Sequence, residues 1–362
     1  MEIIQVVPKL PPAIDGLGDY ALNLARQLRQ EFNQETHFVV GDPNWHRERD
    51  IEGFPISVLP KRSGAAVLSC LNQMDASPAS VLLHYVGYGY AQRGCPVWLV
   101  DGLQRWRTTG FNRFLVTMFH ELYAFGPPWT SSFWLSPLQK HLARHLARLS
   151  DRILTSRQDY AKALCDLSSG KHSQISTLPV FSNIGEPDRV SALAQRERCI
   201  VVFGSPSNRR RVYRESWVEL QLTCELLGIE EIWDIGSKTG LNLSTVNGVP
   251  IRELGERSAA EISGLLLKSL AAFFNYTPEF LAKSTIYAAY CAHGLLPVSH
   301  VGSPVSVDGI IEGKHFWTPH HQTDGLKSLE SLQAIADQAH AWYQTHNLSV
   351  QAQTFAALLA NH

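Results

Sequence analysis

Short apolar runs alternate with helical patterns along the first half of the chain. One amphipathic segment spans residues 19–32, and Ser136-Pro137 gives an N-cap and a first-turn signal for a helix that runs to residue 149. This alternation is typical of a parallel sheet with helices on both faces. The apolar runs predict strands at residues 3–7, 37–40, 56–59, 81–85, 114–119, 152–155 and 175–179.

A segment without periodicity, residues 178–188, contains two prolines and a glycine and is predicted to be a linker. A second series follows, with strands at 199–203, 231–235, 249–252, 271–274 and 296–299, helices at 212–227, 259–270 and 278–293, and a helical tail over 326–359.

This pattern predicts an α/β protein of two Rossmann-like, doubly wound domains that face each other across a cleft. We expect an N-terminal Rossmann-like domain over residues 1–182 and a C-terminal Rossmann-like domain over residues 183–340. Residues 341–362 are expected to form a helix that packs back on the first domain. Open sheets of this kind bind ligands at the carboxyl ends of their strands, so the loops after those strands are the candidate sites.

Composition narrows the function classes. Apolar residues make up 44% of the 362 residues, and 32 Lys and Arg nearly balance 33 Asp and Glu, which argues against a dedicated nucleic-acid binder. The six cysteines form no CxxC pair, so neither a disulfide scaffold nor a structural zinc site is indicated. We find no signal-peptide pattern and no apolar run of the length that spans a bilayer, and expect a cytoplasmic protein for which peripheral membrane contact stays open.

The loop after the first strand leads into a helix through Gly16, Gly18 and Asp19. Glycines at a helix N-terminus let a ligand approach the backbone N–H groups. Gly16, Gly18 and Ala21 also fit the GxGxxA dinucleotide pattern, with Asp42 as the acidic partner. The prolines between strand and glycines disfavour the tight pyrophosphate turn, and an ordinary loop is the alternative.

Two further strand ends carry candidate chemistry. Tyr85 and Tyr88 alternate with glycines, which suits stacking on a sugar face, although a plain surface turn explains them equally. His120 is followed by Glu121 at the next strand end, where an imidazole can act as an acid or base or donate to a substrate hydroxyl.

The second half carries the one dense cationic cluster of the sequence. Gly204 is followed by Arg209, Arg210, Arg211 and Arg214 in a loop predicted to enter a helix. Guanidinium groups bind phosphate in bidentate fashion, so we expect Arg209 or Arg211 to contact a diphosphate, the alternative being a solvated basic face.

The residues around position 278 predict the start of a helix. Glu279 and Lys283 lie four residues apart on one face of this helix. We expect Glu279 to accept from ribose hydroxyls and Lys283 to contact phosphate. The alternative is an ion pair within the helix. His141 and His145 could share a metal, but no third ligand is signalled and the chain has no DxD pair, so we expect neither a metal site nor a cofactor.

Together the glycine loop, the strand-end histidine, the arginine segment and residues 292–298 (AHGLLPV) resemble GT-B glycosyltransferases of family 4 (glycosyl transferases group 1). The resemblance implies metal-independent transfer, with retention, of a hexosyl-type sugar from a nucleotide-diphosphate sugar to a glycan, lipid or small-molecule acceptor. It implies that His120 lies in the cleft and is the catalytic residue. The other implied roles are donor-phosphate binding by Arg209, Arg211, Lys283, Ser284, Thr285 and Gly18, nucleotide or sugar binding by Gly204 and Glu279, and an acceptor side formed by Gly16, Asp19, Tyr85, Tyr88 and Glu121.

One motif departs from the family. Leu281 and Ala289 stand where the family has the two glutamates of its E-x7-E motif. A catalytically inactive GT-B-like protein that binds a nucleotide or glycan therefore remains the alternative, ahead of an NAD-dependent oxidoreductase.

Overall fold

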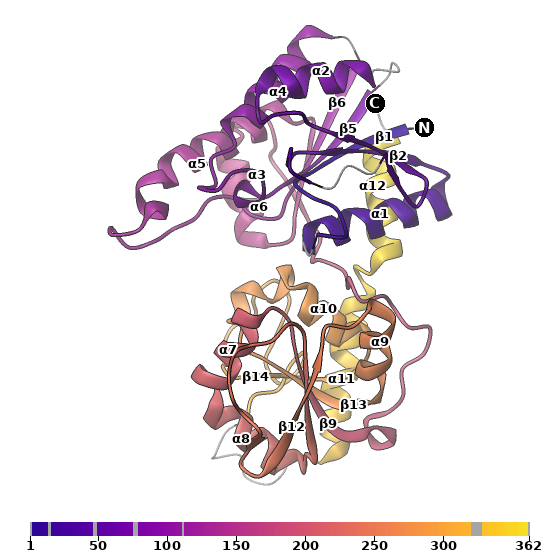
Figure 1. Ribbon diagram of the computed structural model, residues 1–362, viewed down its shortest axis with the longest axis vertical. Coiled ribbons are helices and arrows are strands. Elements are labelled where there is room, and N and C mark those ends of the chain that lie inside the picture. The colour runs from indigo at the N-terminus through magenta and orange to yellow at the C-terminus, as the bar shows by residue number, and fades with distance from the viewer. Residues whose placement is uncertain are drawn as a thin grey trace. The chain divides into compact units, whose positions relative to one another are not determined.

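The computed structural model describes residues 2–13, 16–45, 49–74, 79–110, 112–319 and 328–360. The chain divides into two compact units (Figure 1). Unit 1 comprises Met1–Pro179 and Leu348–His362, and unit 2 comprises Val180–Asn347. Each unit is built on one largely parallel sheet, which confirms the prediction of two Rossmann-like, doubly wound α/β domains.

The sheet of unit 1 has eight strands in the order β3-β4-β2-β1-β5-β6-β7-β8, and all neighbours are parallel except β3 and β4. Strand β1 is buried from its second residue to its last, as expected for a central strand covered on both faces. The strands are β1 (Glu2–Val7), β2 (Glu35–Val40), β3 (Asp50–Ile51), β4 (Phe54–Val58), β5 (Ala79–Tyr85), β6 (Arg113–Phe119), β7 (Arg152–Thr155) and β8 (Ser176–Thr177).

Helices cover both faces of this sheet, with α2 and α4 on one side and α1 and α12 on the other (Figure 1). The terminal helix α12 packs against α1, where the Tyr20 hydroxyl donates to Gln351 Oε1 at 2.5 Å. The helices of unit 1 are α1 (Gly16–Phe32), α2 (Gly64–Gln73), α3 (Gly87–Tyr90), α4 (Val97–Thr109), α5 (Ser131–Leu149), α6 (Gln158–Leu167) and α12 (Leu348–Ala360).

Unit 2 repeats the plan with a six-stranded sheet in the order β11-β12-β10-β9-β13-β14. Its strands are β9 (Glu197–Phe203), β10 (Glu231–Ile235), β11 (Thr245–Val246), β12 (Val249–Gly255), β13 (Ser269–Phe274) and β14 (Leu296–Ser299). Its α-helices are α7 (Pro206–Glu215), α8 (Trp217–Leu227), α9 (Ala259–Lys268), α10 (Thr285–Ala292) and α11 (Leu329–Gln344), and its 3-10 helices are η1 (Leu193–Gln195) and η2 (Pro278–Lys283).

Several predicted helices have different bounds in the structure, and the predicted helical tail 326–359 is two helices, α11 and α12. Helix α5 begins at Ser131, so Pro137 lies inside it and not at its first position. The predicted helix 212–227 is two helices, because Ser216 leaves the helical conformation and accepts a hydrogen bond from Asn275 through its hydroxyl. The predicted helix 278–293 divides at Ser284, whose hydroxyl caps α10 by accepting from the Tyr287 backbone N–H at 3.2 Å.

The strand orders fix where each unit can bind a ligand. Chain connections leave in opposite directions from β1 and β5 in unit 1, and from β9 and β13 in unit 2. Such switch points in open α/β sheets create a crevice at the carboxyl ends of the strands. Among the described residues, no helix combines the length and apolar character that crossing a membrane requires.

Candidate functional site

At the switch point of unit 1, α1 begins in close contact with the loop after β1. A Cβ added at Gly18 would lie 2.6 Å from the Lys9 carbonyl oxygen, so only glycine permits this approach. Gly16 is exposed and Asp19 is half-buried on the same first turn. Gly16, Gly18 and Asp19 therefore lie together at the start of α1, beside the carboxyl end of β1.

His120 follows β6 and lies beside a second histidine, which the sequence analysis did not single out. The His120 backbone N–H donates to the Tyr85 carbonyl at 3.1 Å. His84 Nδ1 and His120 Nε2 are 3.2 Å apart, and the two rings stack with centroids 5.5 Å apart. The Tyr20 ring packs edge-on against both imidazoles, with its centroid 5.0 Å from that of His120 and 5.7 Å from that of His84.

A buried chain of polar groups supports His84. Its Nε2 lies 2.9 Å from Gln5 Oε1, and Gln5 Nε2 donates to Thr36 Oγ1 at 3.2 Å. Gln5, Thr36 and His84 are at most 1% exposed. We call Thr36, Gln5, His84 and His120 the histidine relay.

The hydrogen bonds of the relay indicate which ring nitrogens of the two histidines carry a hydrogen. Because Gln5 Oε1 can only accept, His84 Nε2 carries the hydrogen and His84 Nδ1 accepts from His120 Nε2. Burial lowers the pKa of His84 to about 3, which keeps this imidazole neutral. Chemistry at His120 would consequently run through its other nitrogen, Nδ1.

The neighbouring aromatic candidates lie differently. Tyr85 is fully buried and its ring packs edge-on against Phe119 with centroids 5.3 Å apart, so we do not assign it to acceptor binding. Its hydroxyl has no hydrogen-bond partner among the described residues. Side chains alternate along a strand, and at the end of β5 it is His84 that turns toward the switch point. Tyr88 is 43% exposed and its hydroxyl accepts from Gln139, while Glu121 is half-buried beside His120.

In unit 2 the arginines lie on α7 itself and not in a loop before it. Arg209 is 1% exposed, and its guanidinium donates to Asp234, to the Ser237 carbonyl and, at 3.0 Å, to the Gly204 carbonyl. The Tyr213 hydroxyl donates to the second oxygen of Asp234 at 2.8 Å. These contacts make Arg209 part of the packing of unit 2, so of the two arginines expected to contact a diphosphate we assign this role to Arg211.

Arg211 is the arginine that reaches the switch point. It is half-buried, and its guanidinium donates to Asn208 Oδ1 at 2.9 Å and lies 5.8 Å from the centroid of the Tyr276 ring. Asn208 Nδ2 in turn donates to the Tyr276 hydroxyl at 2.5 Å. Burial raises the pKa of Tyr276, and Arg211, Asn208 and a hydrogen bond with Ser284 oppose this rise. We call Asn208, Arg211, Tyr276 and Ser284 the arginine cluster; it joins the segments after β9 and β13.

The remaining donor-side candidates lie around this cluster. Gly204 has φ of +134°, and a Cβ there would lie 2.7 Å from the Ile286 side chain, so the turn after β9 requires glycine. Lys283 is half-buried, with its Nζ 5.2 Å from the Phe280 ring centroid, and Thr285 is the first residue of α10. Glu279 is exposed on η2.

The two positions of the altered E-x7-E motif are internal. Leu281 is 1% exposed and Ala289 is fully buried. A carboxylate at either place would be desolvated in this structure, so the small and apolar residues suit their surroundings. Within the described ranges, no group of three or more His, Cys, Asp or Glu side chains is positioned to hold a metal ion.

Comparison with known proteins gives no sequence match: no family model matches the chain, and no curated protein matches it. Solved structures do match. WaaG, a glycosyltransferase involved in lipopolysaccharide biosynthesis, shares 11% identity at a TM-score of 0.59, over 99% of this chain and 100% of its own.

An alpha-glucosyltransferase solved with UDP and a 13-mer DNA shares 10% identity at a TM-score of 0.60, over 99% of both chains. The α,α-trehalose 6-phosphate synthase from Burkholderia multivorans shares 13% identity at a TM-score of 0.59, over 99% of this chain and 96% of that one. Over nearly its whole length, the chain therefore has the GT-B fold of these enzymes.

Proposed function

We propose that the protein is a glycosyltransferase of the hexosyltransferase type, which moves a sugar from a nucleotide-diphosphate sugar to an acceptor without a metal ion and with retention. The observation that carries the proposal is the arginine cluster at the switch point of unit 2, in a chain whose fold matches nucleotide-sugar enzymes from end to end.

The donor diphosphate is assigned to unit 2. Arg211 supplies a permanent positive charge, and the backbone N–H groups at the start of α10 supply further donors beside Ser284 and Thr285. Lys283 adds a second cation next to these groups. Negative charge grows on the leaving diphosphate during transfer, so this arrangement stabilises the transition state more than the bound donor. Glu279 and Gly204 are assigned to the nucleotide or sugar.

The acceptor is assigned to unit 1. His120 Nδ1 would accept a hydrogen bond from a sugar or acceptor hydroxyl, because the relay holds the hydrogen on Nε2. Gly16 and Asp19 at the start of α1, together with Glu121 and the exposed Tyr88, form the acceptor side in this proposal.

Neighbouring structures suggest the donor more than the acceptor. The alpha-glucosyltransferase structures contain UDP or UDP-glucose, so uridine diphosphate is the first nucleotide to test. A glycan, a lipid and a small molecule all remain acceptor classes of the proposal. The buried Ala289 and Leu281 favour one second candidate, a protein that binds the donor without transferring its sugar.

The deciding experiment is donor turnover with a panel of UDP-, GDP- and ADP-sugars. We expect release of one nucleoside diphosphate, and His120→Ala should lower kcat by about 10²- to 10⁴-fold with little change in donor affinity. Binding of a donor without turnover would support the non-catalytic candidate instead, and an unchanged rate in His120→Ala would remove His120 from the chemistry.

A further inference from the structure

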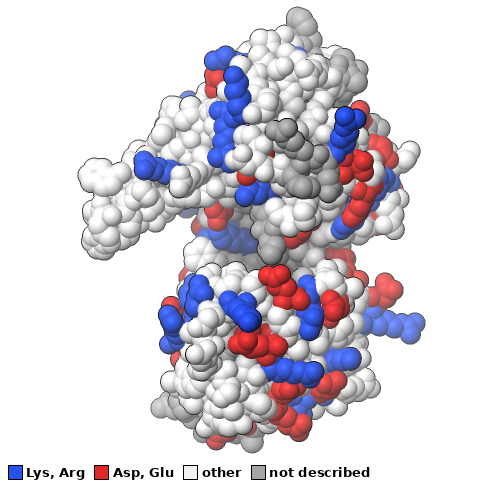
Figure 2. All heavy atoms as spheres, in the orientation of Figure 1, with Lys and Arg blue, Asp and Glu red and all other residues white. Residues whose placement is uncertain are grey.

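The N-terminal end of α5 and the loop before it carry an exposed apolar surface. Residues 122–139 include no Asp, Glu, Lys or Arg. Figure 2 shows this projecting end of unit 1 without charged side chains on the visible face. We define the aromatic tip as its five exposed large apolar side chains, with their exposed fractions: Phe125 (82%), Trp129 (85%), Phe133 (43%), Trp134 (71%) and Leu138 (40%). Monomeric proteins rarely leave such a patch uncovered.

Hydrogen bonds hold the tip in this exposed arrangement. The Trp134 indole N–H donates to the Pro128 carbonyl at 2.8 Å, and the Thr130 backbone N–H and hydroxyl both donate to the Pro127 carbonyl, at 2.9 and 2.7 Å. The rings of Phe133 and Trp134 pack edge-on with centroids 5.3 Å apart. The aromatic rings are therefore presented outward by an ordered turn, which reduces the entropy lost on binding a surface.

The C-terminal half of the same helix is cationic. Lys140, Arg144 and Arg148 recur every four residues, and the sequence has no acidic residue between Glu121 and Asp151. A spacing of four places these cations along one side of the helix. Charge thus changes along α5 from none at its start to wholly positive at its end.

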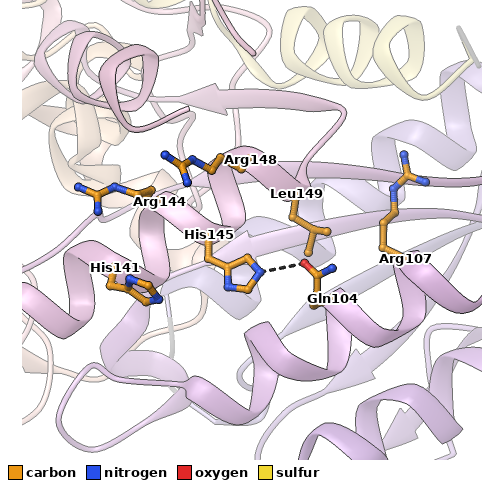
Figure 3. A pocket seen from close by; sticks show the side chains of 7 residues that line it. All are labelled: Gln104, Arg107, His141, Arg144, His145, Arg148 and Leu149. Carbon is orange, nitrogen blue, oxygen red and sulfur yellow. Dashed lines mark hydrogen bonds between the residues drawn. The ribbon is translucent and has the colours of Figure 1, made fainter. Parts of the chain in front are cut away.

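A pocket of about 540 Å³ lies against this cationic half and is lined by Gln104, Arg107, His141, Arg144, His145, Arg148 and Leu149 (Figure 3). Arg107 is paired with Asp151 at 2.5 Å, and His145 Nε2 lies 2.8 Å from Gln104 Oε1. Arg144 is half-buried and forms neither a hydrogen bond nor an ion pair with any described residue.

Positive charge is crowded in this pocket. Burial lowers the pKa of His145, and His141 and Arg148 lower it further. An anion bound beside Arg144 and Arg148 would relieve that repulsion, and guanidinium groups match the geometry of a phosphate.

Two residues of the tip, Trp134 and Leu138, share a face of α5 with residues that line the pocket. Trp134, Leu138, His141, His145 and Arg148 follow one another at spacings of four, three, four and three, which is the repeat of a single helical stripe. At 1.5 Å per residue, the stripe extends about 21 Å from Trp134 to Arg148. A flat surface could therefore meet both at once.

We propose that α5 docks unit 1 on the surface of an anionic lipid bilayer, with the aromatic tip entering the headgroup region and the pocket holding a lipid phosphate. Tryptophan rings favour the membrane–water interface, and cations next to an inserted apolar segment bind anionic headgroups. The purely positive charge beside the tip complements an anionic bilayer. This inference does not depend on the proposed enzymatic activity.

Co-sedimentation of the full chain with vesicles tests the proposal. We expect binding to vesicles of equal parts phosphatidylcholine and phosphatidylglycerol, and much weaker binding to phosphatidylcholine alone. The double variant Arg144→Gln/Arg148→Gln should lower the partition coefficient on anionic vesicles by about 25-fold, at about fivefold for each cation. Trp129→Ser should lower it about fivefold on both kinds of vesicle, because less apolar area enters the interface.

Matched controls lie in unit 2. Arg252→Gln removes a cation whose side chain is 63% exposed, and Val218→Ser removes an apolar side chain that is 56% exposed; neither should change vesicle binding. The proposal is overturned if the wild-type chain ignores anionic vesicles, or if the α5 variants bind them as the wild type does. A wild-type dimer that Trp129→Ser converts to a monomer in sedimentation velocity, without vesicle binding, would assign the tip to self-association and also overturn it.

Discussion

The two switch points of this chain share one topology and carry different chemistry. In unit 1, a fully buried neutral histidine, His84, supports a half-buried one, His120, through a direct hydrogen bond. In unit 2, a buried arginine, Arg209, pairs with Asp234, and the half-buried Arg211 lies two residues further along the same helix.

Each unit thus has a fully buried inner polar residue and a half-buried outer one at the switch point. Unit 1 offers a neutral imidazole, which suits proton transfer and hydroxyl recognition. Unit 2 offers a fixed cation, which suits a diphosphate. The difference shows that the α/β topology fixes where a site forms, while the side chains on the strand ends decide what it can bind.

The largest expected difference between the units is their response to acid. His84 is the one fully buried histidine among the described residues of unit 1, with its pKa lowered by burial to about 3. In unit 2, burial lowers the pKa of His293 and His315 to about 4 and that of His346 to about 3. Below the ordinary histidine pKa of about 6.5, the unfolded chain binds protons that the folded units exclude, so stability falls as the pH falls.

We therefore expect the three strongly shifted histidines of unit 2 to lower its unfolding free energy by up to about 4 kcal/mol per pH unit between about pH 6.5 and pH 5, against about 1.4 kcal/mol from His84 in unit 1. Burial also lowers the pKa of His37, His145 and His172 in unit 1 and of His300 in unit 2, and these histidines add smaller losses of the same sign. Burial raises the pKa of Asp234, which acts in the opposite direction and offsets at most one of the three histidines. Amide hydrogen exchange at pH 7 and pH 5, corrected for intrinsic rates, separates the units. Equal losses of protection in both would contradict the prediction.

The next largest effect is expected from replacing the buried arginine. Arg209→Gln leaves Asp234 buried without its cation, and should lower the unfolding free energy of unit 2 by about 3–5 kcal/mol in urea denaturation. Arg214→Gln, an exposed position on the same helix, should change it by less than about 0.5 kcal/mol. Similar stabilities for the two variants would show that the Arg209–Asp234 pair does not hold unit 2 together.

A smaller effect is expected from the relay of unit 1. His84→Phe removes the acceptor that orients His120 and should lower kcat about tenfold, with a shifted pH–rate profile and unchanged donor affinity. Tyr85→Phe is the matched control, because that neighbouring hydroxyl is buried without a partner among the described residues. An unchanged pH profile in His84→Phe would restrict His84 to a structural role.

Much of the fold was predictable because alternating apolar runs mark buried parallel strands directly. The strand that ends at Phe119 and the strand that ends at Phe203 appear in the structure within two residues of their predicted starts. Helix boundaries were less accurate. Ser216 and Ser284 interrupt helices through contacts with distant residues or by capping, and periodicity carries no such information.

The site was predictable only in part, for a similar reason. Position at a strand end identified His120 and Arg211, but it could not tell which arginine of the run turns inward toward Asp234. His84 was missed because it stands inside a strand, where its polarity was the one available signal, and its partner Gln5 lies 79 residues away in the sequence.

Calorimetric titration of nucleoside diphosphate is the most direct test of the central claim, that the arginine cluster of unit 2 binds a diphosphate. UDP, GDP and ADP are titrated into the wild type, Arg211→Gln and Arg214→Gln. We predict that the wild type binds at least one of them, that Arg211→Gln raises its Kd by about 10- to 100-fold, and that Arg214→Gln binds as the wild type does. A wild type that binds none of the three, or an Arg211→Gln variant with unchanged affinity, would contradict the account.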